Sequence, residues 1–288
     1  MADEVYLDHA GAAKPSKSQL NAVFNEFCQL NLGNPHSRNG ASRLTTELVN
    51  QARYRILAHF NTSQDYYSVI FCSGATAALK LLAENFDFGC EDSHSKKCSL
   101  STQPDCPTFA YLLDNHTSVV GMRQLVKDRA FVRCFEESEL CSILSDGAGD
   151  AGNGSGRNLL VYPAQSNFCG RKYPFEWIAS AHKSAKSWYV CLDAASFVST
   201  NSLNLAEVCP DFVCVSFYKI FGYPTGLGAL LVRNLSSFVL SKTYFGGGTV
   251  LVSIPRQPFH KDKPELSDRE SKQAILHEVE KEGKADIM

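Results

Sequence analysis

The amino-acid sequence predicts an α/β fold in which helices cover both faces of a mainly parallel sheet. Short apolar runs of strand length alternate along the chain with segments whose apolar residues recur at helical spacing. Polar residues directly follow several of these runs, as in sheets that bind ligands at the carboxyl ends of their strands. With 288 residues, of which 44% are hydrophobic, the chain can bury a large core.

Composition argues against several classes of protein. The formal net charge of −2 gives no electrostatic reason to expect nucleic acid or an acidic membrane as a partner. No apolar run approaches the ~18 residues of a membrane helix, and the acidic start of the chain does not resemble a signal peptide. The eleven cysteines stand singly, without the spacing of a metal site. We therefore expect a cytoplasmic protein with reduced, mostly structural cysteines and no metal.

The first elements expected are one strand and two helices. Residues 5–11 have the pattern of a short strand that ends in polar and small residues. Apolar residues at helical spacing predict helices over residues 16–30 and 41–60. The stretch 33–37 separates the two helices, because Pro35 cannot continue a helical hydrogen-bond ladder.

Residues 68–80 predict a strand, a tight turn and a helix. Gly74, Ala75 and Thr76 form the turn, and good helix formers follow them. The free N–H groups at the start of such a helix, together with the positive end of its dipole, can bind a phosphate. A strand, turn and helix of small residues is also a common packing device, so both interpretations stay open at this point.

Further strands are expected over 109–114, 130–135, 158–163, 188–193 and 213–216, with a helix beginning at 115–118. Residues 91–107 lack periodicity and residues 146–157 are rich in glycine, which predicts two surface insertions. Residues 251–288 are highly charged and predict at most one short helix, over 271–281.

Lys219 follows the last of these strands, whose exit also carries Ser216 and Tyr218. Burial behind a strand lowers the pKa of a lysine, and the neutral amine can condense with an aldehyde. The alternative is a lysine that extends from the strand end into solvent. Gly222 and Pro224 should keep the backbone that follows from forming a helix.

Four features share the carboxyl edge of the predicted sheet: the turn at 74–76, His116, Asp193 and Lys219. Individually, Asp193 could cap a helix and His116 could bind backbone. Together they match a cofactor with an aldehyde for Lys219, a pyridine nitrogen for Asp193 and a phosphate for the turn with Ser216. His116 could stack on the ring and shuttle protons. The cofactor with these three groups is pyridoxal 5′-phosphate.

Eight motifs follow one another over roughly residues 5–250. They occupy residues 6–11, 33–37, 71–80, 115–123, 162–167, 192–200, 216–222 and 244–249. In this order they resemble the class V aminotransferase family, in its cysteine desulfurase branch and most closely in the sulfurases of the molybdenum cofactor. The form Ser-Phe-Tyr-Lys-Ile-Phe-Gly at 216–222 favours these sulfurases over the general desulfurases.

The resemblance implies the type I fold of pyridoxal-phosphate-dependent transferases, with a seven-stranded sheet, residues 1–250 as the cofactor-binding large domain and 251–288 as a divergent charged tail. It implies that Lys219 and His116 are catalytic, with Lys219 joined to the cofactor and His116 stacked on its ring. The remaining cofactor contacts that it implies are Asp193 at the pyridine nitrogen, Ala75, Thr76 and Ser216 at the phosphate, Asn167 and Ser196 near the ring oxygen, and Tyr218 in the place of a phosphate-binding histidine.

In that family, L-cysteine gives its sulfur to an enzyme cysteine as a persulfide. The sulfur then passes to the molybdenum cofactor and becomes the sulfido ligand of xanthine dehydrogenase and aldehyde oxidase. The stretch 246–248 resembles a loop that approaches the partner's active site, which implies a homodimer.

Residues 251–288 contain no counterpart of the small C-terminal domain, with its nucleophilic cysteine and carboxylate-binding arginine, so we expect a shortened chain. Cys169, near Asn167, is the one candidate to replace that cysteine. The alternatives are a truncated, noncatalytic protein that binds pyridoxal phosphate and another class V desulfurase or lyase.

Overall fold

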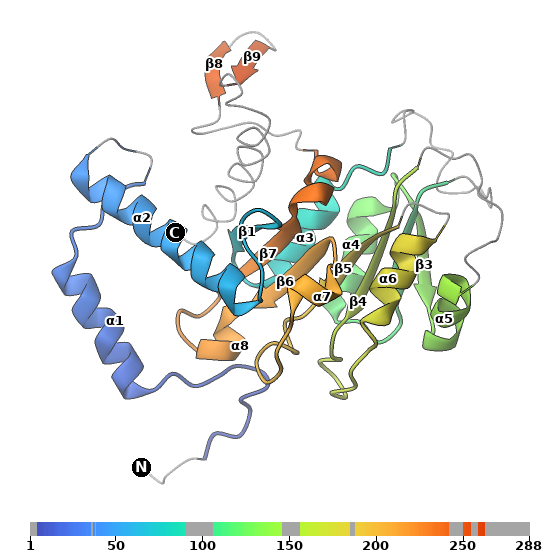
Figure 1. Ribbon diagram of the computed structural model, residues 1–288, viewed down its shortest axis with the longest axis horizontal. Helices are drawn as coiled ribbons and strands as arrows, with labels where there is room; N and C mark the ends of the chain where they lie inside the picture. Colours follow the sequence, from blue (N-terminus) through green and yellow to red (C-terminus); the bar gives the residue numbers. More distant parts are fainter. Residues whose placement is uncertain are drawn as a thin grey trace.

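The computed structural model describes residues 5–35, 37, 39–89, 106–145, 156–184, 188–241, 250–254 and 259–262. Its centre is a seven-stranded sheet in the order β1-β7-β6-β5-β4-β2-β3, shown in Figure 1. The strands of the sheet are β1 Tyr67–Cys72, β2 Thr108–Leu112, β3 Phe131–Phe135, β4 Asn158–Pro163, β5 Trp188–Asp193, β6 Phe212–Ser216 and β7 Gly228–Arg233. The α/β fold with seven strands is confirmed.

Six of the seven strands run in one direction. Strands β3, β2, β4, β5 and β6 pair in parallel, whereas β7 is antiparallel to both of its neighbours, β6 and β1. Parallel neighbours need a long crossover, which α6 supplies between β4 and β5. The connection from β6 to β7, residues 217–227, contains the one-turn helix α8 and needs no crossover, because the two strands are antiparallel.

Four helices, α1, α2, α4 and α7, begin after a residue whose side chain accepts one of the first free N–H groups. Ser16 caps α1 by accepting from the N–H of Gln19, and Asn39 caps α2 by accepting from the N–H of Ser42. The helices are α1 Lys17–Gln29, α2 Gly40–His59, α3 Ala75–Asn85, α4 Thr117–Val126, α5 Glu137–Ser145, α6 Glu176–Lys183, α7 Leu205–Val208 and α8 Phe217–Phe221, and η1 Asn234–Val239 is a 3₁₀ helix.

Helices cover both faces of the sheet, as predicted, and each face has its own hydrophobic core (Figure 1). One core joins the sheet to α2, α5, α6 and α7, and the other joins it to α3 and α4. Successive strand residues alternate between the two: Val190 and Leu192 belong to the first core and Cys191 to the second. Helices therefore cover both faces of the sheet, and a ligand can bind at the carboxyl ends of its strands.

Two predictions about local structure are wrong. Residues 5–11 form no strand. They turn instead, with the N–H groups of Gly11 and Ala12 donating to the carbonyl of Asp8. The tail after residue 250 was expected to hold at most one helix, yet β8 Val250–Ile254 pairs with β9 Phe259–Asp262. Most of both expected insertions, the expected helix over 271–281 and the stretch 246–248 lie outside the described residues.

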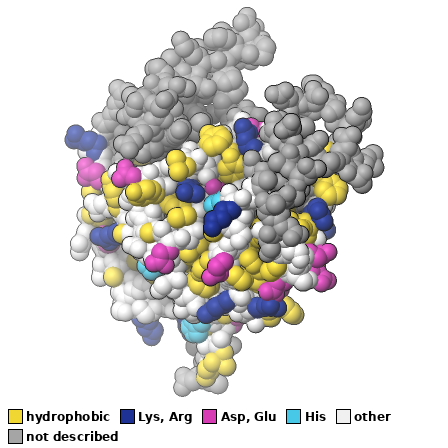
Figure 2. Space-filling model, turned by 45° about the vertical axis from the view of Figure 1, so that its right-hand side comes forward, with side chains coloured by type: hydrophobic (Ala, Val, Ile, Leu, Met, Phe, Trp, Pro, Cys, Tyr) yellow, Lys and Arg dark blue, Asp and Glu magenta, His cyan; other side chains and the backbone are white. Residues whose placement is uncertain are grey.

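Some of the cysteines are buried, and the surface carries charges of both signs. Cys72, Cys191 and Cys214 are buried in strands, and the nine described cysteines are thiols. On the face that Figure 2 shows, described acidic and basic side chains are interspersed. Among the described residues, no helix combines the length and the apolar character that crossing a bilayer requires.

Candidate active site

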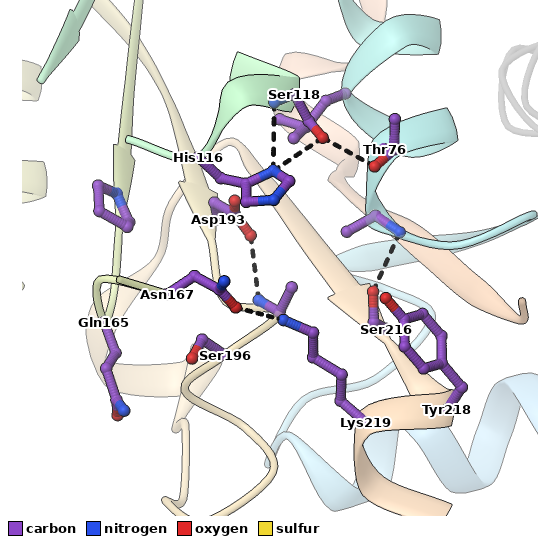
Figure 3. Close-up of a pocket in the computed structure, with 14 residues that line it drawn as sticks. Thr76, His116, Ser118, Gln165, Asn167, Asp193, Ser196, Ser216, Tyr218 and Lys219 are labelled. Carbon is purple, nitrogen blue, oxygen red and sulfur yellow. Dashed lines mark hydrogen bonds between the residues drawn. The ribbon is translucent and has the colours of Figure 1, made fainter. Parts of the chain in front are cut away.

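A pocket lies at the edge where β4, β5 and β6 end, and Figure 3 shows it closely. All nine predicted site residues line this pocket: Ala75, Thr76, His116, Asn167, Asp193, Ser196, Ser216, Tyr218 and Lys219. The sequence analysis missed five further lining residues, namely Leu79, Ser118, Pro163, Gln165 and Ala195. The fold therefore brings together side chains from α3, α4, α8 and three strand ends.

Lys219 lies in the one-turn helix α8, which begins directly after β6. The sequence analysis expected Lys219 directly at the end of a strand, whereas the structure places it in a helix. This helix ends at Gly222, whose positive φ of +75° favours glycine. A Cβ at Gly222 would lie 2.4 Å from the carbonyl oxygen of Ala13, so glycine lets the N-terminal segment pack against α8. One turn of helix is enough to direct the lysine side chain into the pocket.

The amine of Lys219 forms one hydrogen bond and is partly buried. Its Nζ donates to the Oδ1 of Asn167 at 2.6 Å, as drawn in Figure 3. Burial lowers the pKa of Lys219, and the negative charges of Asp193 and Asp8 partly oppose that effect. Compared with an exposed lysine, this amine is more often in the neutral, nucleophilic form.

Asp193, the last residue of β5, places a buried carboxyl group on the floor of the pocket. The side chain is only 7% exposed, and its Oδ1 accepts the N–H of Ala195 at 3.1 Å. Burial raises the pKa of Asp193, whereas the charges of His116 and Lys219 oppose this rise. An anion buried in this way is stabilised by a cationic group that binds beside it.

The turn at Gly74 forms a cradle at the start of α3. Gly74 has φ of +89°, a conformation that favours glycine, and it precedes the first residue of the helix, Ala75. The N–H of Ala75 donates to the Oγ of Ser216 at 3.1 Å, which ties the helix start to the end of β6. The positive end of the helix dipole thus meets two hydroxyl-bearing side chains, Thr76 and Ser216, at the pocket wall.

His116 is the N-cap of α4 and lines the same pocket. Its Nδ1 accepts the N–H of Ser118 at 3.2 Å and lies 2.9 Å from the Oγ of Ser118. That hydroxyl is in turn 2.8 Å from the Oγ1 of Thr76 (Figure 3). The sequence signal for Ser118 was its place two residues after a histidine at a helix start.

Cys169 does not line the pocket, contrary to its expected place beside Asn167. Its side chain is exposed, and its Sγ lies 3.5 Å from the Oδ2 of Asp114. The loop after β4 turns between the two residues, so that Asn167 faces Lys219 while Cys169 faces outward. Among the described residues that line the pocket, none is a cysteine.

The fold and the pocket define the class of protein. The chain belongs to the class V aminotransferase family, whose sequence profile matches residues 5–97 and 150–265. A cysteine desulfurase of Escherichia coli has the same fold, with a TM-score of 0.63 and 18% identity over 96% of this chain and 67% of that one. A cysteine desulfurase of Thermococcus onnurineus superposes with a TM-score of 0.66 and 17% identity, over 98% of this chain and 68% of that one. The type I fold of pyridoxal-phosphate-dependent transferases is thereby confirmed.

Sequence similarity is higher to one group of proteins. The chain is 47% identical over 270 residues to molybdenum cofactor sulfurase 2 of Aedes aegypti, covering 92% of this chain and 34% of that protein. It is 44% identical over 282 residues to the molybdenum cofactor sulfurase of Homo sapiens, covering 93% of this chain and 30% of that protein. The chain thus spans about a third of the length of these relatives.

Proposed function

We propose that this chain is the cofactor-binding part of a molybdenum cofactor sulfurase, which binds pyridoxal 5′-phosphate at Lys219 and acts on L-cysteine. The observation that carries the proposal is that Lys219, Asp193 and the cradle at Gly74 face one pocket. The names of the relatives, which match nearly the whole chain at 44–47% identity, support the choice of reaction.

The pocket fits each of the three groups of that cofactor. The Lys219 amine, with its lowered pKa, suits the aldehyde, and the buried Asp193 carboxylate suits a protonated pyridine nitrogen. The helix start beyond Gly74, where the backbone is open and no Cβ intrudes, suits the phosphate, with Ala75, Thr76 and Ser216 as donors.

Bound pyridoxal phosphate supplies an electron sink for the carbanion formed when a substrate loses its α-proton. The chain's own residues provide the rest. Lys219 would hold the cofactor through its Nζ, and the same amine would accept the α-proton of the substrate. Asp193 would keep the pyridine nitrogen protonated, and His116 would pack on the ring face and exchange a proton.

Three polar residues complete the proposed cofactor site. Asn167 and Ser196 would contact the ring oxygen, and Asn167 would also bind the substrate carboxylate. Tyr218 lies beside the cradle, since a Cβ on Gly74 would be 3.7 Å from its ring. All three side chains line the pocket, which supports these roles.

The sulfur of L-cysteine would pass to a cysteine outside this pocket and then to the molybdenum cofactor. Of the described residues that line the pocket none is a cysteine, and Cys169 is exposed outside it, which favours a cofactor-binding chain that lacks persulfide chemistry of its own. A homodimer in the cytoplasm completes the proposal.

Absorbance and chemical trapping test the proposal. The purified chain incubated with pyridoxal phosphate should gain a visible absorbance band, and borohydride should then fix the cofactor on Lys219. Lys219→Ala should abolish both signals. Lys172→Ala is the matched control, because Lys172 also donates to an asparagine Oδ1 at 2.6 Å, that of Asn201. Correctly folded wild-type protein that stays colourless would refute the proposal.

Alanine release from L-cysteine distinguishes a chain that is active in desulfuration from a noncatalytic chain that only binds pyridoxal phosphate. We expect at most traces of alanine from the 288-residue protein loaded with pyridoxal phosphate. Turnover comparable to that of a complete desulfurase would show that a cysteine of this chain accepts the sulfur. In that event Cys169→Ser is the first variant to measure.

A further inference from the structure

We propose that Ser118 is a positioning residue for His116: it fixes which ring nitrogen carries the proton and links the ring to the start of α3. The inference deepens the proposed function, because it concerns a residue that would face the cofactor. The sequence analysis assigned no role to Ser118.

Three short contacts define the arrangement, which Figure 3 shows. The backbone N–H of Ser118 donates to the Nδ1 of His116 at 3.2 Å, and the Oγ of Ser118 lies 2.9 Å from the same nitrogen. The Oγ1 of Thr76 lies 2.8 Å from the Oγ of Ser118. A side chain of α4 therefore connects a histidine to the turn of the cradle.

The backbone contact decides the direction of the others. A backbone N–H can only donate, so Nδ1 of His116 must be the acceptor. The hydroxyl of Ser118 then also donates to Nδ1, and its lone pair accepts the hydroxyl proton of Thr76. A neutral imidazole that accepts at Nδ1 carries its proton at Nε2.

This direction has a consequence for the proposed chemistry. With Nδ1 occupied by two donors, Nε2 is the only ring nitrogen of His116 that can exchange a proton with a group in the pocket. The same network includes Thr76, which belongs to the proposed phosphate cradle, so the orientation of the ring and the shape of the cradle depend on one hydroxyl.

A serine near a helix start can also be an ordinary capping residue, and the chain offers a matched control for that reading. Ser18 stands two residues after the N-cap Ser16 of α1, as Ser118 stands two residues after the N-cap His116 of α4. Its Oγ lies 2.9 Å from the Oγ of Ser16, and it is not among the pocket-lining residues. Ser18→Ala thus makes the same change at the same helical position elsewhere.

Nitrogen-15 NMR of the histidine-labelled chain without cofactor measures the tautomer directly. His116→Gln identifies the resonances of His116 among the eight histidines. In Ser118→Ala the backbone donor remains, so the ratio of Nε2–H to Nδ1–H forms of His116 should fall on the order of fivefold, the population effect of one neutral hydrogen bond. Ser118→Thr, which keeps the hydroxyl, should restore the ratio, and Ser18→Ala should leave it unchanged.

A ratio in Ser118→Ala equal to that of the wild type would overturn the inference, as would a failure of Ser118→Thr to restore it. Alanine is a good helix former, and the unfolding transition of each variant shows whether the fold is kept. The result is independent of the proposed function. If wild type does not bind pyridoxal phosphate but the tautomer ratio shifts, the cofactor proposal fails and the positioning role of Ser118 stands.

Discussion

The Nζ of Lys219 lies 2.6 Å from the Oδ1 of Asn167 and so joins α8 to the loop that follows β4. The two residues are 52 positions apart in the sequence. The contact holds the amine at the pocket with a neutral acceptor, which leaves the charge of the lysine to be set by burial and by more distant carboxylates.

Asn167→Asp should shift the reaction of Lys219 to higher pH. A carboxylate beside Nζ favours the charged ammonium and raises the pKa of Lys219, so less neutral amine is present at a given pH. Borohydride trapping of pyridoxal phosphate as a function of pH measures this. Asn201→Asp places a carboxylate beside Lys172 in the same geometry and should leave the profile unchanged. The prediction would be contradicted if the midpoint of the trapping profile of Asn167→Asp lay at the same pH as in the wild type or at a lower one.

Asp8→Asn should shift the same profile in the opposite direction. The negative charge of Asp8 raises the pKa of Lys219, so its removal lowers that pKa and neutral amine appears at lower pH. The asparagine oxygen can still accept the N–H of Gly11, which keeps the local turn. Asp128→Asn, at the end of α4, is the control for a general change in charge. The electrostatic role of Asp8 is excluded if Asp8→Asn and Asp128→Asn give the same profile.

Asp193→Asn should stabilise the chain without cofactor while weakening its binding of pyridoxal phosphate. Burial raises the pKa of Asp193, so its charged form destabilises the fold. The gain should be absent below the ordinary pKa of aspartate, grow as pH rises and be complete above the raised pKa. We expect the free energy of unfolding at neutral pH to rise, within the about 0.5 to 2 kcal/mol of stabilising single substitutions.

Urea unfolding of wild type and Asp193→Asn at acidic and neutral pH measures the gain, and absorbance titration measures the affinity for pyridoxal phosphate. Asparagine can still accept the N–H of Ala195, although this hydrogen bond favours the charged carboxylate and so opposes part of the gain. A loss of stability at neutral pH would mean that the carboxylate is better stabilised in the pocket than its burial indicates.

Gly228→Ala should destabilise the chain by about 2 to 3 kcal/mol, as overpacking does. A Cβ at Gly228 would lie 2.5 Å from the carbonyl oxygen of Val215 and 2.6 Å from the Cα of Gly74, both of them backbone atoms. The substitution should also weaken phosphate binding, because it displaces the turn at Gly74. Thermal and urea unfolding measure the first effect.

The matched glycine is Gly121, within α4, where an added Cβ would meet no atom within 4 Å. Gly121→Ala should raise stability by about 0.5 to 1 kcal/mol, because alanine loses less backbone entropy in a helix. Equal effects of the two substitutions on stability would show that the close approach of Gly228 to Gly74 does not require glycine at position 228.

Local patterns in the sequence predicted the elements that have a strong period or a clear stop. The runs that became β4, β5 and β6 are continuously apolar, which is typical of strands buried on both faces. Residues 5–11 show why such patterns can mislead. Their apolar residues suggested a strand, but a strand exists only where another one pairs with it, and here the carbonyl of Asp8 closes a turn instead.

The candidate site was predictable to the extent that its residues stand at strand exits or in a recognisable motif. Asp193 ends one buried run, and Lys219 stands three residues after another. Ser118 and Gln165 escaped notice, because a serine or glutamine in a loop or a helix start has no meaning until its neighbours are known. The partner of Ser118 is Thr76, and that pairing depends on α3 lying beside α4.

By itself, the sequence determined the α/β class, six of the seven strands of the sheet and nine of the fourteen residues that line the pocket, since each depends on short-range periodicity or on a motif. Only the tertiary structure decided that β7 runs against its neighbours, that Cys169 faces outward and that Thr76, Ser118 and His116 form one network. The physical reason is that a hydrogen bond requires two groups within about 3 Å. For residues far apart in the chain, the packing of whole helices and strands sets that distance.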